Sequence, residues 1–189
     1  MNLVEPIRDL NKIEEMKKVL LEQGKGKRNY LIFKVGINIG IRVSDIIKLK
    51  VSDIRYENGT MRDDITIIEK KTNKKKTFRF NIELKKELED YTKQMQQYEY
   101  IFKSRKGTNQ PLTRTQVYRF LNDAAKMVGI TDSIGTHTMR KTFGFHNYKK
   151  YADVAMLQTI FNHSSPSITL RYIGISQDEI NNMYDDFCL

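Results

Sequence analysis

The chain has 189 residues, and a domain of that length buries roughly 70% of the surface that its unfolded chain would expose, so one hydrophobic core is expected. Its 33 basic and 23 acidic residues give a net charge of +10, which favours a polyanionic partner such as nucleic acid, although a lysine-rich solubilising surface would give the same charge. The single cysteine, Cys188, excludes an intramolecular disulfide and fits a reducing cytoplasm, and the apolar stretch at residues 30–41 is too short to span a membrane.

The first part of the chain has the apolar spacing of helices. An amphipathic helix is predicted at residues 11–24, because apolar side chains recur there at helical intervals. A second helix is predicted at residues 29–39, where Gly40 ends it, and a short third helix at residues 44–50.

A β-hairpin is predicted next. Residues 64–68 and 77–80 are β-prone runs separated by a turn rich in Lys and Asn. The hairpin should therefore carry a cationic tip.

The rest of the chain is predicted to be helical. Helices are expected at residues 82–98, after a cap at Thr113, at residues 138–151 and 154–161, from Ser165-Pro166 onward, and from a capping box that begins at Ser176. The predicted fold class is α+β, mainly α-helical, with one small antiparallel sheet. The whole chain, residues 1–189, is expected to form one domain.

Three short motifs carry the candidate chemistry. An Arg and an Asp lie at a predicted helix start in the first motif, Gly40-Ile41-Arg42-Val43-Ser44-Asp45. An imidazole and a guanidinium lie at another predicted helix start in the second, His137-Thr138-Met139-Arg140. Further on, His163 precedes Tyr172 by nine residues. Each motif alone is commonplace, since an Arg–Asp pair is ordinarily a surface ion pair and most tyrosines are packing residues.

The order of these motifs strongly resembles the tyrosine recombinase (phage integrase) family. The family pattern is Gly-x-Arg-x-Ser-Asp, a Lys on a hairpin, His-x-x-Arg and His-x8-Tyr, and here it extends from about Leu31 to Gly174. The resemblance implies the recombinase catalytic-domain fold and a site-specific recombinase that cleaves and rejoins DNA through a 3′-phosphotyrosyl intermediate.

The resemblance also implies the role of each residue. Tyr172 would be the nucleophile, Arg42 and Arg140 would hold the phosphate, His137 would assist proton transfer, and His163 would donate a hydrogen bond to the phosphate. Lys71 is the hairpin residue that best matches the family's general acid, and Asp45 would orient Arg42. Other cations would contact DNA phosphates: Lys70, Lys74, Lys75, Lys76, Arg105, Lys106, Arg114 and Lys141.

No cofactor is expected. The phosphotyrosyl bond conserves the energy of the broken bond, so religation needs no ATP, and the family chemistry needs no metal. His137, His146 and His163 do not form a metal-binding cluster with carboxylates in the sequence, and His146 is expected to be structural or exposed.

The expected partner is double-stranded DNA, bound by a homotetramer in which residues 176–189 dock on a neighbouring subunit, with accessory DNA-binding proteins as further candidates. Alternatively, this acidic tail packs on its own domain. Two other functions stay open: a type IB topoisomerase-like enzyme that relaxes DNA, and an accessory protein that binds DNA without cutting it. A bacterial or phage-encoded cytoplasmic protein, acting in integration, excision or phase inversion, fits the pattern.

The chain departs from the family in a few places. Asn162 stands where Gly is usual, Ile39 where Thr is common, and Lys141 where His is frequent. The chain also has no room for the N-terminal domain of most members, so either the catalytic domain works alone, as in small fimbrial invertases, or this is a piece of a longer protein. All the candidate catalytic side chains are present.

Overall fold

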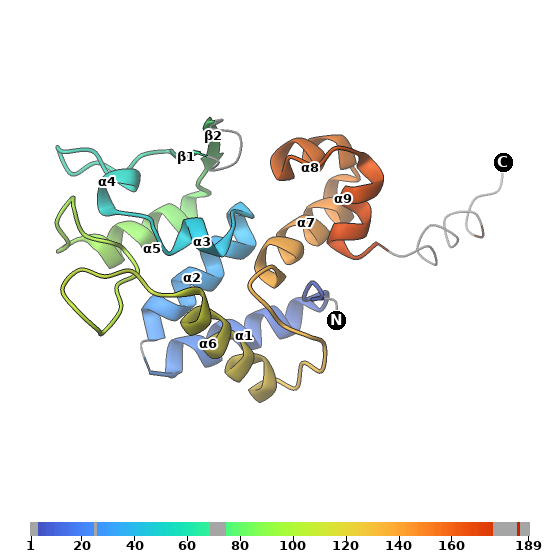
Figure 1. Ribbon diagram of the computed structural model, residues 1–189, viewed down its shortest axis with the longest axis horizontal. Coiled ribbons are helices and arrows are strands. Elements are labelled where there is room, and N and C mark those ends of the chain that lie inside the picture. The colour runs from blue at the N-terminus through green and yellow to red at the C-terminus, as the bar shows by residue number, and fades with distance from the viewer. Residues whose placement is uncertain (1–3, 25, 69–74, 176–184, 186–189) are drawn as a thin grey trace.

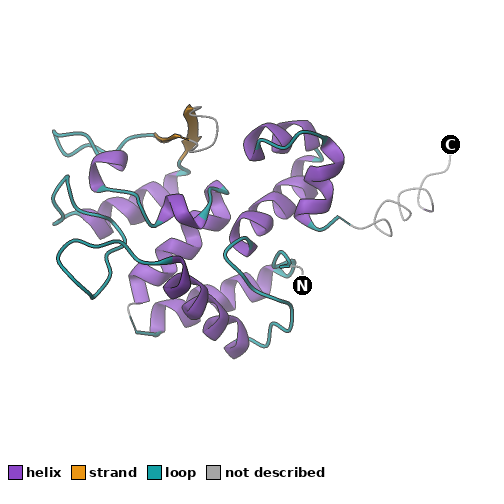
Figure 2. Cartoon of the chain, viewed as in Figure 1, coloured by secondary structure: helices purple, strands orange, loops and turns teal. Residues whose placement is uncertain are grey.

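The computed structural model describes residues 4–24, 26–68, 75–175 and 185. Its elements are α1 (Leu10–Glu22), α2 (Gly26–Ile39), α3 (Val43–Ile46), α4 (Val51–Ile54), β1 (Asp64–Ile68), β2 (Lys75–Arg79), α5 (Ile82–Thr92), α6 (Arg114–Met127), α7 (Thr138–Tyr151), α8 (Val154–Phe161) and α9 (Pro166–Ile173). The chain is mainly helical, with one small antiparallel hairpin (Figures 1 and 2). The predicted fold class is confirmed.

Side-chain caps fix several helix starts that the sequence predicts. The Thr113 hydroxyl accepts a hydrogen bond from the Gln116 amide, and the Gln116 side chain accepts one from the Thr113 amide, so α6 begins with a capping box. Ser165 caps α9 with Pro166 in its first turn. Helices α7 and α8 have the predicted bounds.

The helix predicted at residues 44–50 is wrong. The chain forms α3, leaves the helix after Ile46, and begins the separate helix α4 at Val51. Between the two helices Lys50 pairs with Tyr100 in an isolated bridge, and the Leu49 carbonyl accepts a hydrogen bond from the Ile101 amide at 2.8 Å. This pairing with a distant segment requires an extended backbone and interrupts the helix.

The helix predicted at residues 82–98 ends early, at Thr92. The chain after it turns so that the carbonyls of Gln97 and Glu99 accept hydrogen bonds from Ser52 and Val51, both at 3.0 Å. These are the first amides of α4, which have no partner within their own helix. The end of one segment therefore caps the start of another.

The predicted hairpin forms, with β1 at its predicted bounds and β2 ending at Arg79, one residue before the predicted Phe80. Strand β1 pairs with β2 from Asp64↔Arg79 to Ile68↔Lys75, and β2 begins two residues before the predicted Thr77. Ile65 is buried and anchors β1 to the core. The predicted cationic tip and the predicted last helix lie outside the described residues.

Two groups of buried apolar side chains flank the region where the motifs meet. The larger contains Phe33 of α2 and Phe102, and the smaller contains Leu157, Phe161 and Ile173 of α8 and α9. Figure 1 shows α8 and α9 together at one side of the molecule, beside α7. Helix α7 also contacts α2, so it connects the two groups.

Gly144 allows the close packing of α7 against α9. A Cβ atom at this position would lie 2.5 Å from Ile173 and 2.8 Å from the Phe161 ring. The helix that carries Arg140 can therefore approach the helix that carries Tyr172. Among the described helices, none is both long and apolar enough to cross a membrane.

Candidate active site

The turn between α2 and α3 presents Arg42. Gly40 ends α2 with a φ of +69°, a backbone conformation that glycine adopts without strain. Arg42 follows in an extended conformation as the N-cap of α3, and its side chain is exposed. Its carbonyl accepts a hydrogen bond from the Asp45 amide at 2.8 Å. The motif thus sets Arg42 and Asp45 at the start of one short helix.

Arg140 occupies the centre of the site. Its side chain is buried, with 5% exposed, and its guanidinium donates to the carbonyl of Gly40 and, at 3.2 Å, to the carbonyl of Phe161. It also lies 4.4 Å from the centre of the Phe161 ring. Burial, opposed by Tyr172 and aided by the nearby charge of Arg42, lowers the pKa of Arg140 to about 10. A guanidinium desolvated in this way is prepared to bind an anion.

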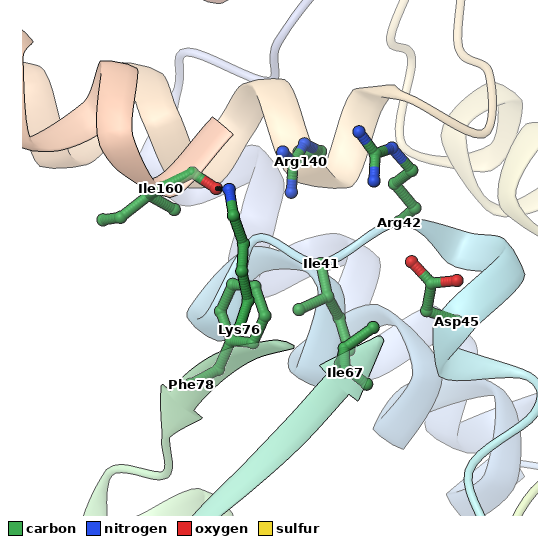
Figure 3. A pocket seen from close by; sticks show the side chains of 8 residues that line it. All are labelled: Ile41, Arg42, Asp45, Ile67, Lys76, Phe78, Arg140 and Ile160. Carbon is green, nitrogen blue, oxygen red and sulfur yellow. Dashed lines mark hydrogen bonds between the residues drawn. The ribbon is translucent and has the colours of Figure 1, made fainter. Parts of the chain in front are cut away.

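Arg42, Asp45, Arg140 and Lys76 line one small pocket (Figure 3). Ile41, Ile67, Phe78 and Ile160 supply its apolar walls. Figure 3 shows the Arg42 and Arg140 guanidinium groups on one side and the Lys76 side chain reaching up from β2. Three cations from three elements thus converge on one pocket, and guanidinium groups are well suited to bind a phosphate.

Tyr172 lies on α9 with its hydroxyl at the same site. The Tyr172 Oη lies 3.1 Å from the Nδ1 atom of His137. The Tyr172 ring packs edge-on against the rings of Phe161 and His163, with 5.4 and 4.9 Å between the ring centres. Burial raises the pKa of the Tyr172 phenol, while the charges of Arg140 and Arg42 oppose that rise. The hydroxyl is therefore held against a possible proton acceptor and beside cations.

The two histidines of the motifs are both at the site. His137 is the N-cap of α7 and keeps an exposed edge, and the His163 ring lies 3.1 Å, through Nδ1, from the Thr169 hydroxyl. Desolvation by the surrounding protein lowers the pKa of both rings, and the charges of Arg140 and Arg42 lower it further. Neutral imidazole, the form that can accept a proton, is favoured.

The Asn162 departure has a structural explanation. Asn162 ends α8 with a φ of +58° and a ψ of 48°, in the left-handed region. Gly adopts this conformation most easily, and Asn is the other residue type commonly found there at helix ends. The substitution therefore keeps the turn that presents His163.

The hairpin lysines divide into two groups. Lys70, Lys74 and the expected general acid, Lys71, lie outside the described residues. Lys75 is exposed at the start of β2, whereas Lys76 lies in the pocket and donates to the carbonyls of Thr159 and Ile160 at 3.1 and 3.3 Å.

The other cations expected at DNA phosphates also differ in position. Arg114 is exposed in the first turn of α6, and its charge is close enough to lower the pKa of His137. Arg105 and Lys106 are exposed and line a separate hollow next to α6. Lys141 does not lie on the exposed face of α7 where a phosphate contact was expected; it is buried against Tyr172.

Some residues of the site were missed by the sequence analysis. Phe161 packs against Arg140 and Tyr172, and Thr169 contacts the His163 ring. An apolar residue and a Thr at helical spacing carry no signal that distinguishes such roles from ordinary packing. His146 contacts the Ile7 carbonyl through Nε2 at 2.9 Å, which agrees with its expected structural role. Within the described residues, no three His, Cys, Asp or Glu side chains gather as metal ligands would.

The site places a phenol hydroxyl between a pocket lined by guanidinium groups and an imidazole nitrogen, an arrangement suited to an enzyme that transfers a phosphoryl group to tyrosine. Residues 8–179 match the model of the phage integrase family, and the chain belongs to that family of tyrosine recombinases. The resemblance expected from the motifs is confirmed.

Two relatives indicate how the family varies in length. The chain is 47% identical over 187 residues to the probable integrase/recombinase YoeC of Bacillus subtilis, covering 99% of this chain and 98% of that protein. It is 34% identical to the tyrosine recombinase XerH of Campylobacter jejuni, covering 88% of this chain and 48% of that protein. The chain thus spans about half the length of the Xer recombinase and nearly all of YoeC.

Solved structures share the fold. XerA recombinase matches with a TM-score of 0.74 at 21% identity, covering 97% of this chain and 65% of that one. The catalytic domain of bacteriophage HP1 integrase matches with a TM-score of 0.66 at 19% identity, covering 97% of this chain and 95% of that domain. XerH site-specific recombinase bound to a palindromic difH substrate, in a post-cleavage complex, matches with a TM-score of 0.73 at 19% identity, covering 98% of this chain and 52% of that one.

Proposed function

We propose that this chain is a site-specific DNA recombinase that cleaves and rejoins DNA through a 3′-phosphotyrosyl intermediate. The observation that carries the proposal is the position of the Tyr172 hydroxyl, 3.1 Å from the His137 Nδ1 atom and beside Arg140, in a site that Arg42 shares. The names of the relatives, integrase and tyrosine recombinase, support the same function.

In the proposed step the Tyr172 oxygen attacks the phosphorus atom of the scissile phosphate. A new O–P bond forms as the bond to the 5′-oxygen breaks, and the proton of Tyr172 passes to His137. Arg42 and Arg140 stabilise the negative charge that builds up on the non-bridging oxygens, and this charge is greater in the transition state than in the bound substrate. His163 donates a further hydrogen bond to the phosphate. Attack by a 5′-hydroxyl reverses the step and rejoins the strand.

The departing 5′-oxygen needs a proton. We assign this proton to Lys71, on the family resemblance alone. Asp45 lines the same pocket as Arg42 and Arg140, and its negative charge favours the charged form of Arg140. It would orient Arg42 and favour the charged form of Arg140.

Double-stranded DNA is the proposed substrate. The net charge of +10 and the exposed cations around the site support binding to a polyanion. Among the structural neighbours, XerH is bound to a palindromic difH substrate, and the Tn1549 transposon integrase is in complex with circular intermediate DNA. The proposed phosphate contacts outside the catalytic pocket are Lys70, Lys74, Lys75, Arg105, Lys106 and Arg114.

The proposed assembly is a homotetramer on two DNA sites. Residues 176–189 include four acidic residues and no basic ones, so this tail would avoid DNA and dock on a neighbouring subunit. Residues 1–175 would form the catalytic domain. Accessory DNA-binding proteins remain a further proposed partner.

Covalent capture tests the function. Wild type, Tyr172→Phe and the control Tyr151→Phe are incubated with supercoiled DNA that flanks the protein's own gene, stopped with detergent, and examined for DNA-linked protein. Tyr151 is exposed on α7, away from the site, so its variant should form the adduct like wild type. Tyr172→Phe should bind DNA and form none. Adduct in Tyr172→Phe would remove Tyr172 from the mechanism, and binding without adduct in wild type would favour the non-cutting accessory protein.

A further inference from the structure

A buried lysine lies against the nucleophile. Lys141 follows Arg140 on α7, and only 6% of its surface is exposed. Its ammonium nitrogen lies 5.5 Å from the centre of the Tyr172 ring. At that distance a cation is attracted by the π electrons of the ring. The Lys141 ammonium therefore lies over the face of the Tyr172 ring, whereas His137 contacts the Tyr172 hydroxyl.

Neighbouring charges show how the fold tolerates this buried cation. Burial lowers the pKa of Lys141, the Glu5 carboxylate favours its charged form, and Arg8 disfavours it. Glu5 and Arg8 form an ion pair at 3.2 Å. Arg8 also donates to the Gly174 carbonyl at 2.9 Å, directly after the helix that carries Tyr172. The segment before α1 thus brings a carboxylate to Lys141 and is itself attached to the end of α9.

The contact between Lys141 and Tyr172 becomes stronger when Tyr172 reacts. A neutral phenol attracts a cation only through its π electrons, whereas a phenolate carries a full negative charge. Attack on the phosphate requires the phenol to lose its proton, and religation requires the phenolate to depart. A cation fixed at the ring therefore stabilises the reacting state more than the resting state in both directions.

We propose that Lys141 is a positioning residue for the nucleophile, which holds the Tyr172 ring in place and favours its phenolate form during cleavage and religation. The proposal rests on the assignment of Tyr172 as the nucleophile. Lys141 acts through the ring and not on the phosphate, in contrast to Arg42 and Arg140.

Three variants test this role. Lys141→Met keeps the length of the side chain and removes the charge, Lys141→Arg keeps the charge, and Lys141→Gln is a second neutral variant in case Met impairs folding. The matched control is Lys150→Met. Lys150 lies on the same helix, is exposed, and places its ammonium 5.1 Å from the Tyr151 ring. The Lys150→Met substitution therefore removes the same charge and the same type of contact, but at a position away from the nucleophile.

The first measurement is the rate of covalent adduct formation in a single turnover. Lys141→Met and Lys141→Gln should react about tenfold more slowly, equivalent to ~1.4 kcal/mol. Lys141→Arg should recover most of that rate, and Lys150→Met should match wild type. A buried lysine with only a packing role would not need its charge, so Lys141→Met would then be as active as Lys141→Arg.

The second measurement does not depend on cleavage. The chemical shifts of the labelled Tyr172 ring carbons are recorded by NMR in the DNA-free protein at neutral pH, where Lys141 keeps its charge, with Tyr172→Phe identifying the signal. The titratable groups that face this phenol in every variant are Arg42, Arg140, His137 and His163. Removing the Lys141 charge should shift this signal, Lys141→Arg should restore most of it, and Lys150→Met should leave it unchanged.

The two measurements separate this inference from the proposed function. If wild type forms no adduct, the recombinase function fails, but the NMR signal of the Tyr172 ring still tests the contact between Lys141 and Tyr172. If wild type forms adduct and both neutral variants react at the wild-type rate, the inference is overturned, whatever the NMR signal shows. An unchanged ring signal in the neutral variants overturns it as well.

Discussion

Replacing Gly40 by Ala should damage both the fold and the site. Gly40 has a φ of +69°, and a Cβ atom there would lie 2.8 Å from two carbons of the Phe143 ring and closer still to a third. Its carbonyl accepts a hydrogen bond from Arg140, and Arg42 lies two residues further on. The turn thus orients both arginines of the phosphate pocket.

The size of the effect follows from two contributions. An L-residue in the left-handed region costs about 1–2 kcal/mol. Forcing a methyl group into a packed site costs a further 1–3 kcal/mol or so. The free energy of unfolding of Gly40→Ala should therefore fall by roughly 2–5 kcal/mol. Gly129→Ala is the matched control, because Gly129 has a φ of +70° with no atom within 4 Å of the added Cβ. It should lose only the first contribution.

Urea unfolding of wild type and both variants measures these differences, and covalent capture on DNA reports on the site. Gly40→Ala should form adduct at least about tenfold more slowly at temperatures where it is folded, since a displacement of catalytic groups by about 1 Å can cost 10²-fold. Gly129→Ala should react like wild type. Equal losses of stability in the two variants would refute the close contact with Phe143, and wild-type cleavage by Gly40→Ala would refute the role of the turn.

Other changes probe the same site. Arg42→Ala and Arg140→Ala should each slow adduct formation by roughly 10²–10⁴-fold, measured in single turnovers, and unchanged rates would contradict the phosphate assignment. Because the pKa of His137 is lowered in the folded protein, the unfolded chain binds more protons, so stability should fall as pH drops below about 6.5, the ordinary pKa of a histidine side chain. Urea unfolding at two pH values should show a smaller fall in His137→Gln. Asn162→Ala should lower the free energy of unfolding by about 1 kcal/mol and Asn162→Gly should not, as thermal unfolding would reveal. Deleting the residues after Ser176 should weaken assembly on paired DNA sites in native gels, and unaltered assembly would contradict the docking tail.

Local signals predicted most of the helices correctly. Helices α7 and α8 have their predicted bounds, and α6 begins at the predicted cap, Thr113. The errors at residues 44–50 and 82–98 share one cause. Lys50 pairs with Tyr100, and Leu49 accepts a hydrogen bond from the Ile101 amide. The carbonyls of residues 97 and 99 cap α4. Such pairing depends on segments that meet only in the folded chain, so helical periodicity could not reveal it.

The motifs predicted which residues lie together at the candidate site, but not all of the cations that enter it. Arg42, His137, Arg140, His163 and Tyr172 meet as the resemblance implies. Lys76 and Lys141 were expected only to contact DNA phosphates. One lies in the pocket and the other beneath the nucleophile, because strand alternation and helix packing turn them inward. A list of lysines in a sequence does not contain that information.

The position of Lys76 leads to a further prediction about the hairpin. Its ammonium donates to the carbonyls of Thr159 and Ile160, two of the last carbonyls of α8, where a cation is favoured by the helix dipole. Lys76 thus ties β2 to the helix that precedes His163. In Lys76→Met this tie is lost, at a cost of about 1 kcal/mol, which corresponds to roughly fivefold faster opening of the hairpin.

Amide hydrogen exchange measures that opening directly. The amides of the β1–β2 ladder, from Ile65↔Phe78 to Ile67↔Lys76, should exchange about fivefold faster in Lys76→Met, while those of α1 should not change. Lys75→Met is the matched control, because Lys75 is adjacent, exposed and on the opposite face of the strand. If both variants exchange alike, the hairpin is held by its own pairing and by Ile65, and the contact with α8 contributes nothing to its stability. Faster exchange in Lys76→Met alone means that the hairpin and the helix before His163 are coupled, so that a DNA phosphate competing for Lys76 would release the hairpin from α8.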